Sequence, residues 1–164
     1  MSEIDELIKQ YCPNGVEYNK FEEVASYIRG ITYNKSQESK NNEGIKVFRA
    51  NNISLKTNTL NYEDVKVVST VVKVKDSQFL KEKDILICAG SGSKEHIGKV
   101  AYITENMDYT FGGFMGVIRC NNTLNSRYLF HILRSSYFIQ HLDKELNSST
   151  INNLNSQIMN IFFL

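Results

Sequence analysis

Short apolar runs alternate with polar and glycine-rich segments through the middle of the chain, and this pattern predicts a β-sheet. Residues 84–89 (DILICA) are too few for a buried helix and have the length of a buried strand. Residues 99–103 (KVAYI) are rich in Val and Ile and predict a second strand. The segment between them, 90–98, holds three glycines and mostly polar side chains. We therefore expect a hairpin with a long exposed connection, in which hydroxyl groups, Lys94 and His96 are available to a ligand.

Other segments of the chain also have the alternation or the β-branched content of strands, and they are residues 27–31, 45–49, 65–74 and 117–120. The third of these is interpreted as one strand or as two short strands broken near Ser69. Residues 35–44 contain no apolar side chain and predict a surface loop. In the glycine-rich segment 110–116, we expect Gly112 and Gly113 to serve backbone packing.

Helices are expected near both ends of the chain. Ser2 can cap a first helix whose apolar side chains share one face, namely Ile4, Leu7, Ile8 and Tyr11. Residues 21–25 predict one or two helical turns. The clearest helix begins at Asn125 or Ser126 and continues as one apolar stripe through Leu146. These elements predict an α+β fold, with a curved, largely antiparallel β-sheet and flanking helices.

The final segment, 157–164 (QIMNIFFL), is strongly apolar. Burial of its two phenylalanines and its last leucine contributes on the order of 5 kcal/mol, so exposure would be unfavourable. We therefore expect this segment to pack back as a strand on the sheet of its own chain, or else to drive self-association.

Length and composition narrow the class of protein. A chain of 164 residues with 41% hydrophobic and 23% charged residues is typical of one globular domain. The net charge of +1 does not identify a partner, because a nucleic-acid binder of this composition must gather its cations on one face. Three widely spaced cysteines without a CxxC motif, no secretory signal and no apolar run of membrane-spanning length together predict a cytoplasmic location.

A search for catalytic motifs gives negative results. Gly92 and Gly98 lack the spacing of a nucleoside-triphosphate phosphate loop, and a strand pattern follows them where that motif needs a helix. The GxSxG turn of serine hydrolases and the proline-rich turn of adenine methyltransferases are both missing. No cysteine has a histidine at metal-ligand spacing. Asp64 and Lys66 have a spacing that some nucleases use, but one such tripeptide is expected by chance. We therefore expect no catalytic site and no metal site.

Several segments in order resemble a known family: the target recognition domain of the DNA specificity subunit in type I restriction-modification systems. The resemblance covers nearly the whole chain, and the segments that carry it are 12–18 (CPNGVEY), 21–25 with Arg29 and Gly30, 49–53 (RANNI), 83–87, 91–93, 97–101, Tyr128 to Leu133, and 151–155 (INNLN).

The resemblance implies a non-catalytic reader of double-stranded DNA, which directs adenine methylation and restriction by partner subunits. It implies modification (methyltransferase) subunits as partners and, through them, restriction subunits. It also implies no cofactor of its own, since S-adenosylmethionine, ATP and Mg²⁺ are expected only on those partners. In the family, a long spacer helix follows the domain. We therefore expect residues 1–164 to be a single recognition domain that stops before this spacer helix, and to be a monomer or weak dimer.

Loops at one edge of the predicted sheet carry the candidate DNA contacts that the resemblance favours. The candidates for phosphate contacts are Lys35, Arg49, Lys94 and Lys99, and those for base contacts are Asn51, Asn52, Ser91 and Ser93. Each has an alternative role in the fold itself. Arg49 can pair with an acidic neighbour, Asn51 and Asn52 can cap a turn, and Lys99 can be a solvated strand residue.

The sequence is also compatible with three other functions. One is a small enzyme that uses its glycine-rich loops as a substrate pocket. Another is a protein-interaction module or inactive remnant, such as a truncated or silent specificity cassette without independent activity. A third is the specificity module of a related methyltransferase-nuclease.

Overall fold

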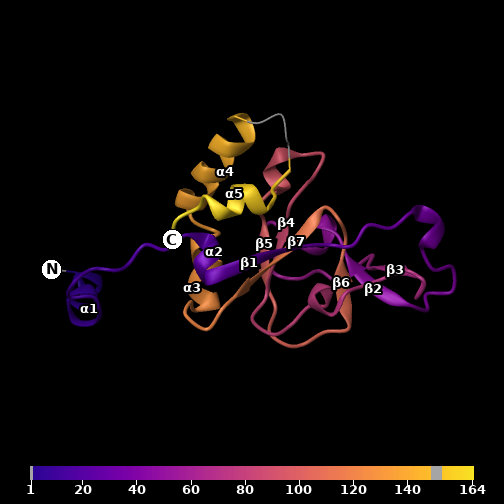
Figure 1. The fold of residues 1–164 in the computed structure, drawn as a ribbon, viewed down its shortest axis with the longest axis horizontal. Helices are drawn as coiled ribbons and strands as arrows, with labels where there is room; N and C mark the ends of the chain where they lie inside the picture. The colour runs from indigo at the N-terminus through magenta and orange to yellow at the C-terminus, as the bar shows by residue number, and fades with distance from the viewer. Residues whose placement is uncertain (1, 149–152) are drawn as a thin grey trace.

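The computed structural model describes residues 2–148 and 153–164, and its described strands form two sheets (Figure 1). The first sheet has the order β1 (Ala25–Arg29), β7 (Met115–Cys120), β4 (Ile85–Cys88) and β5 (Val100–Tyr102). The second has the order β3 (Lys66–Val68), β2 (Ile45–Phe48) and β6 (Tyr109–Phe111). All pairs are antiparallel except β2 with β6, which is parallel. The predicted α+β class with largely antiparallel pairing is confirmed, and the sheet is divided in two.

The predicted hairpin of β4 and β5 forms in the first sheet, where β4 lies between β7 and β5 and β5 is the edge strand. Every residue of β4 is buried, because alternate side chains enter two different hydrophobic clusters. Ile85 and Ile87 pack with the helices, whereas Leu86 and Cys88 pack on the other face with Phe48, Phe111 and further apolar side chains. A strand covered on both faces explains why its sequence is a continuous apolar run.

Four helices contribute to the first of these clusters, and they are α2 (Phe21–Val24), α3 (Ser126–Ile132), α4 (Ser136–Ser148) and α5 (Ser156–Asn160) (Figure 1). The predicted single helix through Leu146 is wrong, because α3 ends at Ile132 and α4 begins at Ser136. The Oγ and N atoms of Ser135 both donate to the Ile132 carbonyl, at 2.6 and 3.0 Å. Such a local serine bond competes with the helical ladder and allows the chain to turn.

The N-terminal helix α1 (Glu3–Tyr11) confirms the predicted cap, since Ser2 and Asp5 form a reciprocal capping box. Its apolar face contacts no core. None of its residues is buried, and Figure 1 shows it standing apart from the body of the molecule. The pattern of apolar residues therefore predicts the helix correctly without indicating what, if anything, covers it.

The C-terminal segment packs back on its own chain, but the predicted strand on the sheet is wrong, because α5 covers residues 157–160 and the rest joins neither sheet. After α5, Phe163 forms a β-bridge with Lys20, and Phe162 and Leu164 are 1% and 8% exposed. In the segment 65–74 only β3 forms, and Val71 is exposed. None of the helices in the described residues is long and apolar enough to cross a membrane.

Candidate nucleic-acid interface

A groove of about 1070 Å³ lies where parts of both sheets meet. Its lining comes from the end of β1 and the loop after it, the turn after β2, the β4–β5 connection, the β6–β7 turn, and Asn153. Four of the eight residues predicted to contact DNA lie in this lining, namely Lys35, Arg49, Asn51 and Ser91. The fold therefore collects side chains that are up to 56 positions apart in sequence, from 35 to 91.

The glycines beside the groove serve close backbone approach. A Cβ on Gly30 would lie 2.0 Å from the carbonyl oxygen of Gly112, so only glycine lets β1 run so close to the β6–β7 turn. The amide of Gly112 donates to the Phe48 carbonyl at 2.9 Å, which ties the same turn to β2. These contacts fix the two sheets relative to each other at the groove. The crowded position is Gly30, because a Cβ on Gly112 would lie 3.8 Å from its nearest neighbour, the Phe48 carbonyl oxygen.

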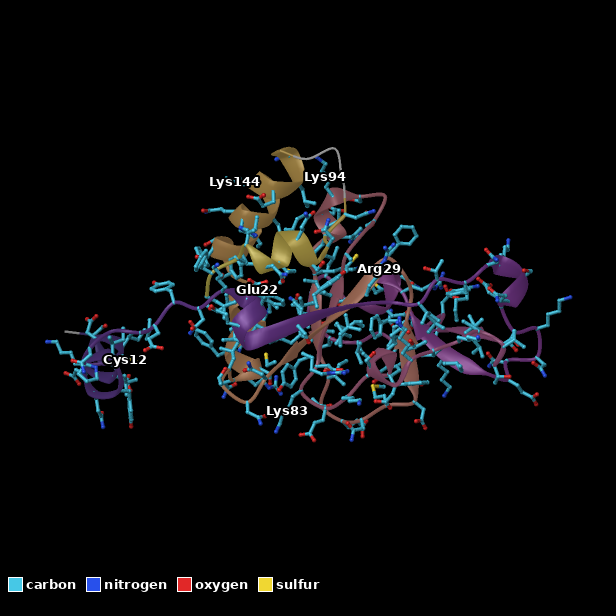
Figure 2. All side chains as sticks on the ribbon, in the orientation of Figure 1. Cys12, Glu22, Arg29, Lys83, Lys94 and Lys144 are labelled. Carbon is cyan, nitrogen blue, oxygen red and sulfur yellow. The ribbon has the colours of Figure 1, made fainter. Side chains whose placement is uncertain are left out.

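Two cations of the groove have no carboxylate partner among the residues that the structure describes. Arg29 is the last residue of β1 and is exposed (Figure 2). Lys35 begins a short 3-10 helix and is also exposed. The two acidic residues of the lining are paired, since Glu38 binds Lys66 at 3.3 Å and Asp64 binds Arg49 at 2.7 Å. The groove is therefore positive where Arg29 and Lys35 project.

Arg49 is held by one of its terminal nitrogens. Its Nη2 donates to both the Oδ2 atom and the backbone carbonyl of Asp64, at 2.7 and 3.0 Å. Asn51 Nδ2 reaches the same carboxylate at 3.5 Å. The Nε atom of Arg49 is buried without a partner in the described part of the chain. Because Nη2 carries two hydrogens and both are used, Nη1 is the group that is left to contact a ligand.

The prediction that Asn52 contacts a base edge is wrong. Its side chain is fully buried, so it cannot reach a base edge. Its Oδ1 accepts from the Arg49 amide at 2.8 Å, and its Nδ2 donates to the carbonyls of Asn61 and Glu63 at 3.0 and 2.9 Å. The alternative role as a turn cap is the one that the structure shows, and this amide holds the 49–63 loop in place.

The β4–β5 connection brings only part of its predicted contacts to the groove. Ser91 lines it, and Ser93 instead precedes the short helix 94–96. Lys94 and Lys99 lie together in a separate pocket of about 340 Å³. There Lys94 Nζ donates to Asn147 Oδ1 at 3.2 Å and Lys99 Nζ to the Ile53 carbonyl at 3.0 Å. Burial lowers the pKa of the Lys99 ammonium.

Sequence reasoning did not predict the other residues of the groove, and those with side chains suited to a ligand contact include Arg29, Tyr33, Phe114 and Asn153. Arg29 had a usable signal, because it is a cation directly before a glycine within the predicted strand 27–31. Burial, and then the carboxylate of Glu38, raise the pKa of Tyr33, so this residue enters the site as a neutral phenol. Phe114 and Asn153 come from segments whose approach depends on the tertiary fold.

Comparisons with known proteins show the family and the fold of the chain. The family model described as "Type I restriction modification DNA specificity domain" matches residues 13–162. The specificity subunit of the type I restriction enzyme StySPI from Salmonella potsdam is 31% identical over 133 residues, and that of EcoKI from Escherichia coli strain K12 is 32% identical over 133 residues. Each alignment covers 80% of this chain and 28% of the relative, so the chain corresponds to little more than a quarter of these subunits.

Solved structures show the same fold. The crystal structure of the HsdS subunit from Thermoanaerobacter tengcongensis superposes with a TM-score of 0.63 at 15% identity, covering 93% of this chain and 33% of that one. The S subunit of a type I restriction-modification system from M. genitalium superposes with a TM-score of 0.62 at 11% identity, covering 98% of this chain and 38% of that one. At these identities the likeness concerns the fold alone.

Proposed function

The chain belongs to the family of type I restriction-modification DNA specificity domains, and from this premise we propose that its groove is the surface that binds double-stranded DNA. In this proposal the chain reads sequence and directs adenine methylation and restriction that partner subunits carry out. The modification subunits are its direct partners, and the restriction subunits join through them. Specificity subunits of these systems are DNA-recognition components.

The observation that carries the proposal is the charge arrangement of the groove. Its carboxylates are paired, and the exposed side chains of Arg29 and Lys35 are left beside amide and hydroxyl groups of Asn51 and Ser91. Cations position a protein on the phosphate backbone, and amide or hydroxyl groups read base edges. A surface that combines both can bind any duplex weakly and a matching sequence more tightly.

The test is the salt dependence of binding. Fluorescence anisotropy with a labelled duplex would be measured for the 164-residue chain and for the Arg29→Ala and Lys35→Ala variants over a series of salt concentrations. We expect a Kd of roughly 10⁻⁴ to 10⁻⁶ M for non-specific duplex and a slope of log K against log salt that falls by about one unit in each variant.

The matched control is Lys144→Ala. Lys144 is an exposed cation on α4, and Figure 2 shows it far from Arg29. We expect this variant to keep the slope of the unchanged chain. Slopes that are the same for Arg29→Ala, Lys35→Ala and Lys144→Ala would remove the groove as the DNA-binding surface.

We also propose that the chain has no methyltransferase, nuclease or ATPase activity and no cofactor of its own. The proposal rests on the family and on the missing catalytic motifs described above. Incubation of the purified chain with duplex DNA and labelled S-adenosylmethionine should incorporate no label, whereas incorporation by this chain alone would overturn it.

A further inference from the structure

We propose that Phe114 and Asn153 together read one A·T base pair from the major groove, an inference that rests on the proposed DNA-binding function. The two side chains come from the β6–β7 turn and from the segment before α5. Both line the groove, and both also line the smaller pocket beside it. Neither residue belongs to the set that sequence reasoning predicted.

Gly90 brings the two side chains together. A Cβ on Gly90 would lie 2.5 Å from Asn153 Oδ1 and 3.0 Å from Phe114 Cδ1. The amide and the ring therefore both occupy space next to Gly90 that a larger residue would need for its side chain. The φ of Gly90 is not in the left-handed region, so the backbone alone does not require glycine there. The close approach of an amide and an aromatic ring requires it instead.

Phe114 is exposed, but its backbone is fixed. Its side chain is 67% exposed in a groove whose other exposed side chains are mostly polar or charged. Its carbonyl accepts hydrogen bonds from the amides of both Ala89 and Gly90, at 2.8 and 3.0 Å. The following residue, Met115, is paired with Cys88 in the sheet. The ring therefore projects from a defined position on the central strands, and the fold gains little from its exposed face.

Asn153 is held in a similar way. The amide of the next residue, Leu154, donates to the Ala89 carbonyl at 2.7 Å, and the Leu154 side chain is buried. In the part of the chain that the structure describes, the Asn153 side-chain amide has no hydrogen-bond partner. It therefore presents both a donor and an acceptor beside an apolar ring.

This combination matches the major-groove edge of an A·T pair. Adenine offers N7 as an acceptor and N6 as a donor, which an asparagine amide contacts with two hydrogen bonds, and thymine offers the C5-methyl group, which apolar side chains contact. No other base pair places a methyl group beside this donor and acceptor pattern. We therefore infer that Asn153 binds the adenine and that Phe114 packs on the thymine methyl.

The experiment begins with selection from a randomised duplex library by the 164-residue chain. The sequences that it selects are compared with those selected by Phe114→Ala, Phe114→Leu and Asn153→Ala. We expect a preferred position with A·T that Phe114→Ala and Asn153→Ala lose and that Phe114→Leu keeps, because leucine preserves an apolar contact. Circular dichroism and thermal melts establish that each variant is folded.

Single-atom changes in the DNA then assign the contacts. Replacing the selected thymine by deoxyuridine removes only the methyl group and should weaken binding by the unchanged chain roughly fivefold, with no further loss in Phe114→Ala. Replacing the adenine by 7-deazaadenine removes the N7 acceptor. This change should weaken binding by the unchanged chain by a similar factor, with no further loss in Asn153→Ala. The controls are Phe163→Ala and Asn122→Ala, which change exposed residues outside the groove and should leave the selected sequence as it is.

The outcomes separate this inference from the function on which it rests. If the unchanged chain selects a motif that Phe114→Ala and Asn153→Ala retain, the inference is wrong and the proposed function stands. If 2-aminopurine fluorescence at the selected position shows that Phe114 unstacks a base, the ring is a wedge and the methyl contact is wrong. If the unchanged chain binds DNA in no sequence-dependent way, the proposed function fails and this inference fails with it.

Discussion

Two arginine–aspartate pairs in this molecule have similar distances but different surroundings. Arg119 on β7 binds Asp84 with two bonds of 2.8 Å, from Nε to Oδ1 and from Nη2 to Oδ2, and Asp84 is 1% exposed. Arg49 in the groove binds Asp64 at 2.7 Å through one nitrogen, and the Asp64 side chain is 68% exposed. In the first pair, both carboxylate oxygens of the buried aspartate bind the arginine. In the second pair, only Nη2 of the arginine binds the aspartate, and Nη1 is left without a partner in the described residues.

The remaining contacts of each pair follow the same division. Asp84 Oδ2 also accepts from the Lys81 amide at 2.8 Å, and Arg119 Nη2 also donates to the Phe79 carbonyl at 3.2 Å. The carboxylate raises the pKa of the Arg119 guanidinium, chiefly through the hydrogen bond. Arg49 has a buried Nε without a described partner and a free Nη1. The buried pair supports stability, and the exposed pair is available for binding.

The largest expected effect is on the buried pair. Arg119→Ala leaves the Asp84 carboxylate buried without its partner, and removing one partner of a buried pair costs about 3–5 kcal/mol. We expect a clear fall in the urea midpoint of unfolding. Arg49→Ala is the matched control and should lose less than about 1 kcal/mol, as is usual for exposed pairs. Equal losses in the two variants would contradict the division between the pairs.

The next effect is on DNA binding, with the order of the two variants reversed. If the proposed function holds, Arg49→Ala should weaken duplex binding roughly fivefold to tenfold and lower the salt slope by about one unit, because the variant lacks the guanidinium that would contact a phosphate. Arg119 contributes no lining to the groove, so Arg119→Lys, which keeps the charge, should bind DNA as the unchanged chain does under conditions where it is folded. Weakened binding by Arg119→Lys with normal binding by Arg49→Ala would exchange the roles assigned to the two arginines.

The sequence predicted features that depend on neighbouring residues and missed features that depend on contacts between distant segments. Asp84 and Asp64 each precede an apolar β pattern, and nothing local distinguishes them. Local signals predicted β4 from its apolar run, β5 from its Val and Ile content, and the cap from Ser2, because these features depend on neighbours in the chain. The burial of Asn52, the helix break at Ser135 and the approach of Phe114 to Asn153 depend on contacts between distant segments. Local patterns carry no information about such contacts, so the family resemblance favoured Asn51 and Asn52 equally, and only the fold places Asn51 in the groove lining and buries Asn52.

A smaller effect is expected from the acidic partner in the groove. Asp64→Asn removes a negative charge beside the phosphate path but keeps an oxygen that can accept from Arg49. We expect affinity for non-specific duplex to rise about twofold to threefold at low salt, with the gain disappearing at high salt as screening increases. Glu22→Gln is the control, since this exposed acid lies on α2 away from the groove (Figure 2). An equal gain in both variants would show only an effect of net charge.

The smallest effect concerns a third ion pair. It tests whether burial or distance decides how much an ion pair contributes to the stability of this fold. Lys81 Nζ binds Asp76 at 2.8 Å, the same distance as between Arg119 and Asp84, but the Asp76 side chain is 91% exposed. The hydrogen bond from Lys81, and then its charge, lower the pKa of Asp76. A carboxyl group with a lowered pKa in the folded state adds stability above its unfolded pKa and loses it as the pH falls through the folded value. Water screens this pair, so Lys81→Met should return the Asp76 pKa toward its ordinary range in an NMR titration without a measurable change in the urea midpoint at neutral pH. A midpoint shift as large as that of Arg119→Ala would mean that distance, rather than burial, decides what an ion pair contributes in this fold.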